Sequence, residues 1–450
     1  MMKSYINKRG YVIIKEHYDA QTLNELRNDL NVKPFNNFAD TVESYKVYEE
    51  NNKKMYLPKI YALNKLGQPD QKKVPEGDDI NLEFCGEIRE NQQIAIDSSL
   101  TSLRTTGGGL LVLPCGYGKT CIGLYLISKI KKKTLVICHK EFLVEQWRER
   151  ISVFLPDARI GIIQGQKFDI EDKDIVIGML QSLSMKEYEL NAFDSINFLI
   201  IDECHHISSK VFSKALRRLN CDYHIGLSAT PKRADGLMKV LHWHIGDIFF
   251  SVSAKEDNKQ KRDVSVKRYI LNSTNHVHYK ELLNYKQRPN VVGMISNIIS
   301  FEKRNCLIVE KILELTRDKR NILVLSERRG HLSLISELLT VNNYDDWGFY
   351  VGGMKIADLK MAENRQVILG TYQMCSEGYD NSNLDTLIMT TSKGDVEQSV
   401  GRILRKKVDI IEPLVVDFVD NFSAFSNQGK KRETFYKKKK YKVKNEILVI

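Results

Sequence analysis

The chain has 450 residues, which is more than one compact core usually holds and predicts two or three domains. Hydrophobic residues make up 42% and charged residues 28%, as in ordinary globular proteins, and no apolar run reaches the roughly 18 residues of a membrane span. The opening residues lack the apolar stretch of a signal peptide, and the eight cysteines include no C-x-x-C pair. We therefore expect an intracellular, reducing compartment, with neither secretion nor structural zinc.

Residues 1–80 are polar and irregular, and we expect them to form a small N-terminal accessory domain of α+β type. From residue 110 onwards, short apolar runs alternate with helical patterns in two blocks, separated by the charged stretch 255–263. This alternation is typical of α/β domains in which a parallel sheet is covered by helices on both faces. The predicted order is accessory domain 1–80, first α/β domain 81–250, linker 251–284, second α/β domain 285–425 and basic tail 426–450.

The individual elements follow from the same alternation. Strands are predicted at 110–113, 134–138, 174–178, 198–201, 223–227, 321–325, 348–351, 366–370, 386–389 and 414–416. Helices are predicted at 120–130, 141–154, 209–219, 302–317, 329–340 and 396–405.

A glycine-rich turn follows the first predicted strand and reads P-C-G-Y-G-K-T over residues 114–120. Between a strand and a helix, such a turn is typical of a phosphate loop, although Leu113 stands where the usual pattern begins with Gly. Backbone N–H groups would face the phosphates, Lys119 would reach the β and γ oxygens, and the Thr120 hydroxyl would hold Mg²⁺. The predicted nucleotide-binding residues of this turn are Cys115, Gly116, Tyr117, Gly118, Lys119 and Thr120.

Two acids end the buried strand predicted at 198–201, and the sequence continues as D-E-C-H over residues 202–205. The carboxyl ends of strands are where α/β sheets bind ligands. We expect Asp202 to hold Mg²⁺ and Glu203 to activate the attacking water. His205 would couple this site to a neighbouring motif. A helix N-cap with a surface acid is the alternative interpretation.

The order of these motifs resembles that of superfamily 2 helicases over about residues 84–445. The resemblance implies two RecA-like domains in tandem. It assigns adenine recognition to Gln92 with Arg89, and further nucleotide contacts to Gly378 and Asp380. It assigns nucleic-acid contacts to His139, Lys140, Gln181, Ser182 and Thr371. Coupling falls to His205, Ser228, Ala229 and Thr230, and the final catalytic block contains Gln398, Arg402 and Arg405.

Arg402 and Arg405 are spaced three apart, which would place both on one face of a helix. From the second domain they would act as arginine fingers on the γ-phosphate when the two domains close around ATP. Surface arginines on a polar helix are the alternative.

The stretch Lys232–Gly236, which reads K-R-A-D-G, has the form seen in xeroderma pigmentosum group B, phage UvsW-type and poxvirus-type transcript-release helicases. With D-E-C-H and Gln398, it favours DNA over RNA. We therefore expect an ATP- and Mg²⁺-dependent DNA helicase or double-strand translocase of transcription, replication or repair. An RNA helicase is an alternative, as is a non-catalytic nucleic-acid binding or annealing protein. The sequence indicates no particular protein partner.

Most of the net charge of +11 lies near the C-terminus. Residues 430–444 carry nine Lys or Arg and one Glu, a charge of +8, which leaves +3 for the other 435 residues. Phe435, Tyr436 and Tyr441 interleave with these cations, as suits phosphate contact combined with base stacking. A solvated tail or a nuclear import signal would have the same composition. If the tail binds nucleic acid, deleting it should weaken affinity more than basal ATP turnover.

Overall fold

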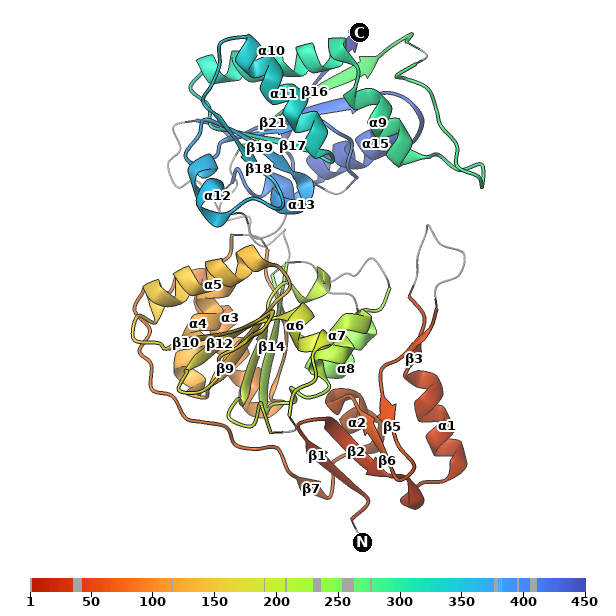
Figure 1. The fold of residues 1–450 in the computed structure, drawn as a ribbon, viewed down its shortest axis with the longest axis vertical. Coiled ribbons are helices and arrows are strands. Elements are labelled where there is room, and N and C mark those ends of the chain that lie inside the picture. Colours follow the sequence, from red (N-terminus) through yellow and green to blue (C-terminus); the bar gives the residue numbers. More distant parts are fainter. Residues whose placement is uncertain are drawn as a thin grey trace. The chain divides into compact units, whose positions relative to one another are not determined.

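The computed structural model describes residues 2–450 apart from 35–42, 115, 190, 207–208, 230–235, 253–262, 276, 376–378, 380, 382, 395 and 405–410. The chain divides into two compact units, Met1–Asn258 and Lys259–Ile450 (Figure 1). In the described part, no helix is both long and apolar enough to cross a membrane.

The N-terminal segment has its own five-stranded sheet, in the order β5-β6-β2-β1-β7. Its strands are β1 (Ser4–Asn7), β2 (Gly10–Ile14), β5 (Glu49–Glu50), β6 (Lys54–Leu57) and β7 (Gln71–Lys72); β3 (Asn31–Val32) and β4 (Tyr45–Lys46) pair separately. Helices α1 (Ala20–Asp29) and α2 (Lys59–Leu66) pack on this segment. Its core also includes Leu237 and Val240, so the accessory segment is part of the first unit.

The main sheet of the first unit has the order β11-β10-β12-β9-β13-β14-β8-β15 and is parallel except for β11. Its strands are β8 (Gly108–Val112), β9 (Thr134–Cys138), β10 (Ile160–Gln164), β11 (Lys167–Phe168), β12 (Ile175–Met179), β13 (Phe198–Ile201), β14 (Tyr223–Ser228) and β15 (Ile248–Ser251). The central strands are buried along their whole length, because helices cover both faces.

One face of this sheet is covered by α3 (Glu90–Thr105), α4 (Lys119–Ile130) and α5 (Glu141–Phe154) (Figure 1). The other is covered by α6 (Leu180–Met185), α7 (Ser209–Leu216) and α8 (Met238–Ile245). The register pairs Ser228 with Val112 and Met179 with Cys138, so parallel strands end along one common edge.

The second unit contains a seven-stranded parallel sheet in the order β18-β19-β17-β20-β21-β16-β22. Its strands are β16 (Ser265–Asn272), β17 (Ile322–Ser326), β18 (Trp347–Tyr350), β19 (Val367–Thr371), β20 (Thr386–Met389), β21 (Leu414–Asp420) and β22 (Lys442–Val449). Its helices are α9 (Val291–Ile299), α10 (Glu302–Arg317), α11 (Arg329–Val341), α12 (Ile356–Glu363), α13 (Tyr372–Cys375), α14 (Glu397–Val400) and α15 (Ser423–Lys438). The predicted pair of parallel α/β sheets is confirmed.

The segment predicted as a basic tail, 426–450, is built into this second sheet. Helix α15 buries Arg432 and Tyr436, and β22 pairs in parallel with β16. The buried Arg432 side chain meets Asp417 on β21, with Nε and Oδ1 2.9 Å apart. Charge composition did not show this inward face, because the lysines of α15 are all exposed.

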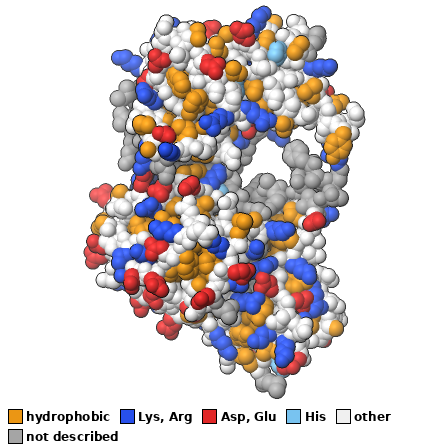
Figure 2. Space-filling model, in the orientation of Figure 1, with side chains coloured by type: hydrophobic (Ala, Val, Ile, Leu, Met, Phe, Trp, Pro, Cys, Tyr) orange, Lys and Arg blue, Asp and Glu red, His pale blue; other side chains and the backbone are white. Residues whose placement is uncertain are grey.

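Two further differences concern boundaries. Strand β16 lies inside the stretch predicted as a linker, 251–284. Helix α14 ends at Val400 instead of continuing to residue 405, and turns follow it. On the face shown in Figure 2, basic and acidic side chains are interspersed over both units.

Candidate nucleotide and nucleic-acid site

Five segments singled out by sequence meet at the carboxyl edge of the first sheet. The phosphate loop follows β8, His139 follows β9, Gln181 lies just after β12, Asp202 follows β13 and Ala229 follows β14. These strands are parallel neighbours in register, so the local sequence signals become one site in space.

The phosphate loop has the backbone that an anion cradle needs. Gly116 and Gly118 have φ angles of +83° and +94°, which side-chain-bearing residues rarely adopt. Gly118 immediately precedes α4, whose first residue is Lys119. The N–H groups at the start of this twelve-residue helix can therefore face phosphate oxygens.

Gln92 is tied to this loop. Its Nε2 donates to the Tyr117 carbonyl at 2.8 Å, and its Oε1 accepts from the Arg89 N–H at 3.0 Å. The side chain is 1% exposed. A Cβ atom on Gly118 would lie 2.2 Å from this Nε2, so any other residue there would displace the Gln92 side chain in addition to straining the backbone at this φ angle. Recognition of adenine by Gln92 stays a prediction.

The two acids after β13 have different surroundings. Asp202 is buried and its Oδ2 accepts from Trp147 Nε1 at 2.9 Å. Burial, together with the adjacent Glu203 carboxylate, raises the pKa of Asp202 to about 6. Glu203 has a left-handed backbone, with φ of +45°, and its Oε1 lies 3.2 Å from Lys119 Nζ. The phosphate loop and the acid pair are thus joined by an ion pair.

The contacts continue to the end of β14. His205 Nδ1 lies 3.5 Å from Glu203 Oε2 and 2.9 Å from Ser228 Oγ. A path of direct contacts therefore runs Lys119–Glu203–His205–Ser228, which we call the relay. Its members come from three strands and were predicted separately. The bond between Trp147 and Asp202 was not foreseen, because the two residues are 55 positions apart in the sequence.

The donor set fits ATP with a divalent cation. Lys119 and the start of α4 supply positive charge for phosphates, while Asp202 and Thr120 offer a carboxylate and a hydroxyl, which are oxygen ligands suited to Mg²⁺. A cation beside Asp202 would favour its ionised form against the effect of burial.

The predicted nucleic-acid residues of the first unit lie on the same edge. Gln181 is exposed, and the half-buried Ser182 accepts from the Gly165 N–H at 2.9 Å. His139 and Lys140 are half-buried just before α5. Contact of these four residues with nucleic acid stays a prediction.

In the second unit, Thr371 ends β19 beside Ser326 of β17. Gln398 lies on α14, and the buried Arg402 follows that helix, donating from Nη1 to the Tyr379 carbonyl at 2.6 Å. Because α14 ends at Val400, Arg402 lies outside this helix, and the prediction of a helix that continues through Arg402 is wrong. Cys115, Thr230, Gly378, Asp380 and Arg405 lie outside the described residues.

Comparisons with known proteins identify relatives of this site and of the whole chain. A family model described as the res subunit of type III restriction enzymes matches residues 86–233. A protein of Acanthamoeba polyphaga mimivirus, provisionally named ATP-dependent RNA helicase L396, is 36% identical over 98% of this chain and 86% of its own length. One from African swine fever virus, provisionally named ATP-dependent RNA helicase QP509L, is 26% identical over 74% of this chain and 69% of its own. The crystal structure of T4 UvsW aligns over 96% of both chains at 19% identity, with a TM-score of 0.37.

Proposed function

Because this chain belongs to the superfamily 2 helicases, and is therefore an ATP-hydrolysing enzyme, we propose that it couples ATP hydrolysis to movement along DNA. The proposed setting is transcription, replication or repair. The observation that carries the assignment of the ATP site is the relay Lys119–Glu203–His205–Ser228, since it connects the phosphate loop to the acid pair and to the next motif by direct contacts.

Lys119 and Glu203 are proposed to exchange partners when ATP binds. The Lys119 ammonium pairs with Glu203, and phosphate oxygens would compete for the same ammonium. Once Lys119 turns to the phosphates, Glu203 is released to accept a proton from the attacking water. Asp202 and Thr120 would hold Mg²⁺, which would offset negative charge on the phosphates. Asp202 itself is held by Trp147.

His205 and Ser228 are proposed to couple the position of the Glu203 carboxylate to the conformation of the segment after β14. Any shift of the Glu203 carboxylate changes the partner available to the His205 ring, which also bonds Ser228. Ala229 and Thr230 would then pass the change to the nucleic-acid contacts of the first unit, which are His139, Lys140, Gln181 and Ser182. Arg402 and Arg405 remain candidates for arginine fingers, with Gln398 in the same block.

DNA is the proposed track because D-E-C-H, the 232–236 stretch and Gln398 resemble DNA-directed branches. RNA is the second candidate, favoured by the names of the mimivirus and swine-fever-virus relatives. Steady-state ATP turnover should be measured with single-stranded DNA, duplex DNA, forked DNA and RNA. Greater stimulation by DNA supports the proposal, and stimulation by RNA alone contradicts it. Lys119→Ala serves as the inactive control.

Strand separation and translocation require a second experiment. A helicase would displace one strand of a partial duplex, whereas a double-strand translocase would displace a triplex-forming strand without unwinding the duplex beneath it. Both assays can use the DNA that most stimulates ATP turnover. Displacement in neither assay would contradict the proposed movement while leaving ATP hydrolysis intact.

A further inference from the structure

The loop after β20, residues 390–394, is held in place by its neighbours at the carboxyl edge of the second sheet. The Thr390 hydroxyl donates to the Leu325 carbonyl at 2.7 Å. Thr391 accepts twice, at its hydroxyl from the Glu327 N–H at 2.8 Å and at its carbonyl from the Tyr372 hydroxyl at 2.8 Å. Thr390 and Thr391 are buried, so water does not compete for these hydrogen bonds, and they hold the first half of the loop in position.

Two buried arginines donate hydrogen bonds to the backbone of this loop. Arg304 of α10 donates to the Thr390 carbonyl at 2.6 Å and pairs with Asp420. Arg432 of α15 donates to the Lys393 carbonyl at 2.6 Å and pairs with Asp417. Each guanidinium thus donates both to a carboxylate on β21 and to a backbone carbonyl of the loop. This is extensive support for a segment with no regular secondary structure.

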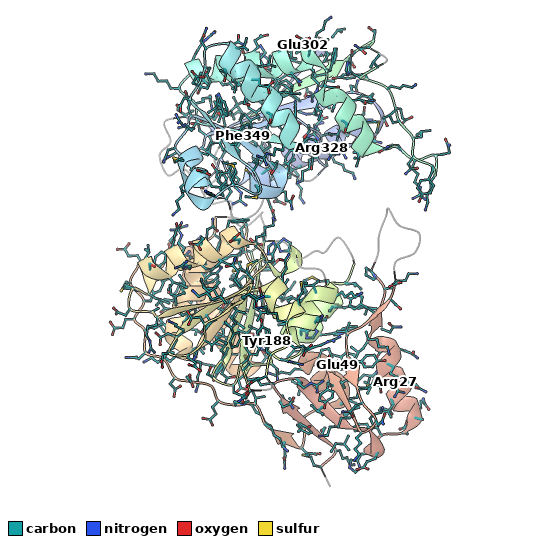
Figure 3. All side chains as sticks on the ribbon, viewed as in Figure 1. Arg27, Glu49, Tyr188, Glu302, Arg328 and Phe349 are labelled. Atoms are coloured by element: carbon teal, nitrogen blue, oxygen red, sulfur yellow. The ribbon has the colours of Figure 1, made fainter. Side chains whose placement is uncertain are left out.

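The supported loop presents cations. Lys393 is half-buried, and its ammonium lies 4.7 Å from the centre of the Tyr372 ring. The Lys431 side chain runs past Gly394, where a Cβ atom would be 3.9 Å from Lys431 Cδ. Within the described residues, Lys393 forms no ion pair, and its ammonium contacts the Tyr372 ring instead. Arg328, labelled in Figure 3, precedes α11 and lies at the same edge of the sheet.

We propose that the 390–394 loop binds a phosphate of the nucleic-acid backbone through Lys393, with Lys431 adding a second, weaker contact. This inference rests on the proposed function, since it extends the track marked by Thr371. Thr371 directly precedes Tyr372, whose ring underlies Lys393. A lysine held on a rigid loop loses little conformational entropy when it binds, so its charge contributes more to affinity than that of a mobile surface lysine.

The test compares Lys393→Ala with Arg317→Ala in the full chain. Arg317 is the exposed last residue of α10, before the amino end of β17, so its removal deletes the same charge at the opposite edge of the sheet. Binding is measured with a fluorescent oligonucleotide of the type that most stimulates ATP turnover, over a range of salt concentrations. We expect Lys393→Ala to raise Kd about tenfold and to lower the salt slope by roughly 0.7–0.9.

Arg317→Ala should change Kd less than about twofold, and neither variant should change the KM for ATP measured without nucleic acid. Equal Kd values for the two variants, or a raised KM for ATP in Lys393→Ala, would overturn this inference. Failure of the unaltered chain to bind any oligonucleotide would instead overturn the proposed function, and this inference with it.

Arg432 is a positioning residue in this scheme, and a double-mutant cycle separates that role from general support of the fold. Arg432→Lys keeps the charge but loses the two-sided contact with Asp417 and the loop. It should weaken oligonucleotide binding in the unaltered chain and should add little when Lys393 is already alanine. Additive losses of affinity would show that Arg432 does not act through Lys393.

Discussion

The ammonium of Lys119 lies 3.2 Å from Oε1 of Glu203, and the two side chains are 11% and 12% exposed. Water therefore screens this ion pair only weakly. The residue expected to bind phosphate and the residue expected to activate water hold each other, so a change at one must change the other.

The first prediction concerns this pair. Lys119→Ala should lower ATP turnover by at least about 100-fold, because it removes the cation facing the phosphates. Glu203→Gln should lower kcat by roughly 10²–10⁴ with little change in KM, since the amide cannot accept the proton of water. Lys129→Ala, at the exposed far end of α4, is the control for charge loss on the same helix. Full ATP turnover in both Lys119→Ala and Glu203→Gln would refute the assigned site.

The second prediction uses the raised pKa of Asp202, about 6. The folded chain holds this proton more tightly than the unfolded chain, whose aspartate pKa is near 3.8. The associated stability is therefore present below pH 4 and lost as pH rises through 6. The free energy of unfolding of the wild-type chain should therefore fall between pH 4 and 7, whereas Asp202→Asn has no carboxyl group to titrate at this position. Relative to wild type, the variant's free energy of unfolding should rise by about 2 kcal/mol over this range. Denaturant unfolding at several pH values checks this.

For that experiment the exposed Asp157 supplies the control variant, Asp157→Asn. A stability difference that is independent of pH in Asp202→Asn would show that burial does not perturb Asp202 as described.

The third prediction concerns Gly118. In Gly118→Ala the new Cβ would lie 2.2 Å from Gln92 Nε2, at a φ of +94°. The loop or Gln92 must then move, and we expect loss of measurable ATP binding. Gly67→Ala shares the positive φ, +82°, and has open space around the added atom, although its ψ of −162° differs from the 36° of Gly118. It should cost about 1–3 kcal/mol of stability and leave ATP affinity unchanged. Equal ATP affinity in both variants would contradict the packing explanation.

The fourth prediction concerns residues 426–450, which are part of the second unit and cannot be deleted as a separate tail. Arg432→Ala would leave the buried Asp417 with Arg268 as its remaining cationic partner among the described residues. We expect a loss of about 3 kcal/mol in the stability of the second unit. Removing residues 426–450 should unfold this unit, since α15 and β22 would both be lost. A chain cut at 425 that keeps a cooperative second unit would refute this.

Charge alone is tested by replacing the exposed Lys430, Lys438 and Lys440 with Gln. The variant should keep its melting temperature within a few degrees. Reduced oligonucleotide affinity would then show that the exposed lysines of the C-terminal segment contribute to binding. Unchanged affinity would confine the contact to Lys393 and Lys431.

The contrast between β13 and β22 explains how much the sequence could predict. Strand β13 is four buried apolar residues followed by two acids, so the apolar run and the motif agree and its boundaries were predicted correctly. Strand β22 begins with two lysines, Asn and Glu around a single valine before its apolar end, is largely exposed, and has β16 as its one neighbouring strand among the described residues. Its place in the sheet comes from pairing across the unit, which local composition does not encode.

The site divides in the same way. Lys119, Asp202 and His205 could be identified because each follows a recognisable strand. The bonds that place them could not, since Trp147 meets Asp202 and His205 meets Ser228 only after the strands have been ordered side by side. For Arg402 the motif was found but its helix was predicted too long, because helical patterning does not signal the turns after Val400.

The position of β16 has a consequence for synthesis on the ribosome. This strand emerges before the rest of the second unit, yet its two neighbours are β21 and β22, with the pair Arg268 and Asn445 separated by 177 residues. At translation rates of about 5–20 residues per second, β16 must wait roughly 10–35 s for its second partner. The first unit can fold while the chain is still being made, whereas β16 needs protection from other nascent chains until β21 and β22 have emerged.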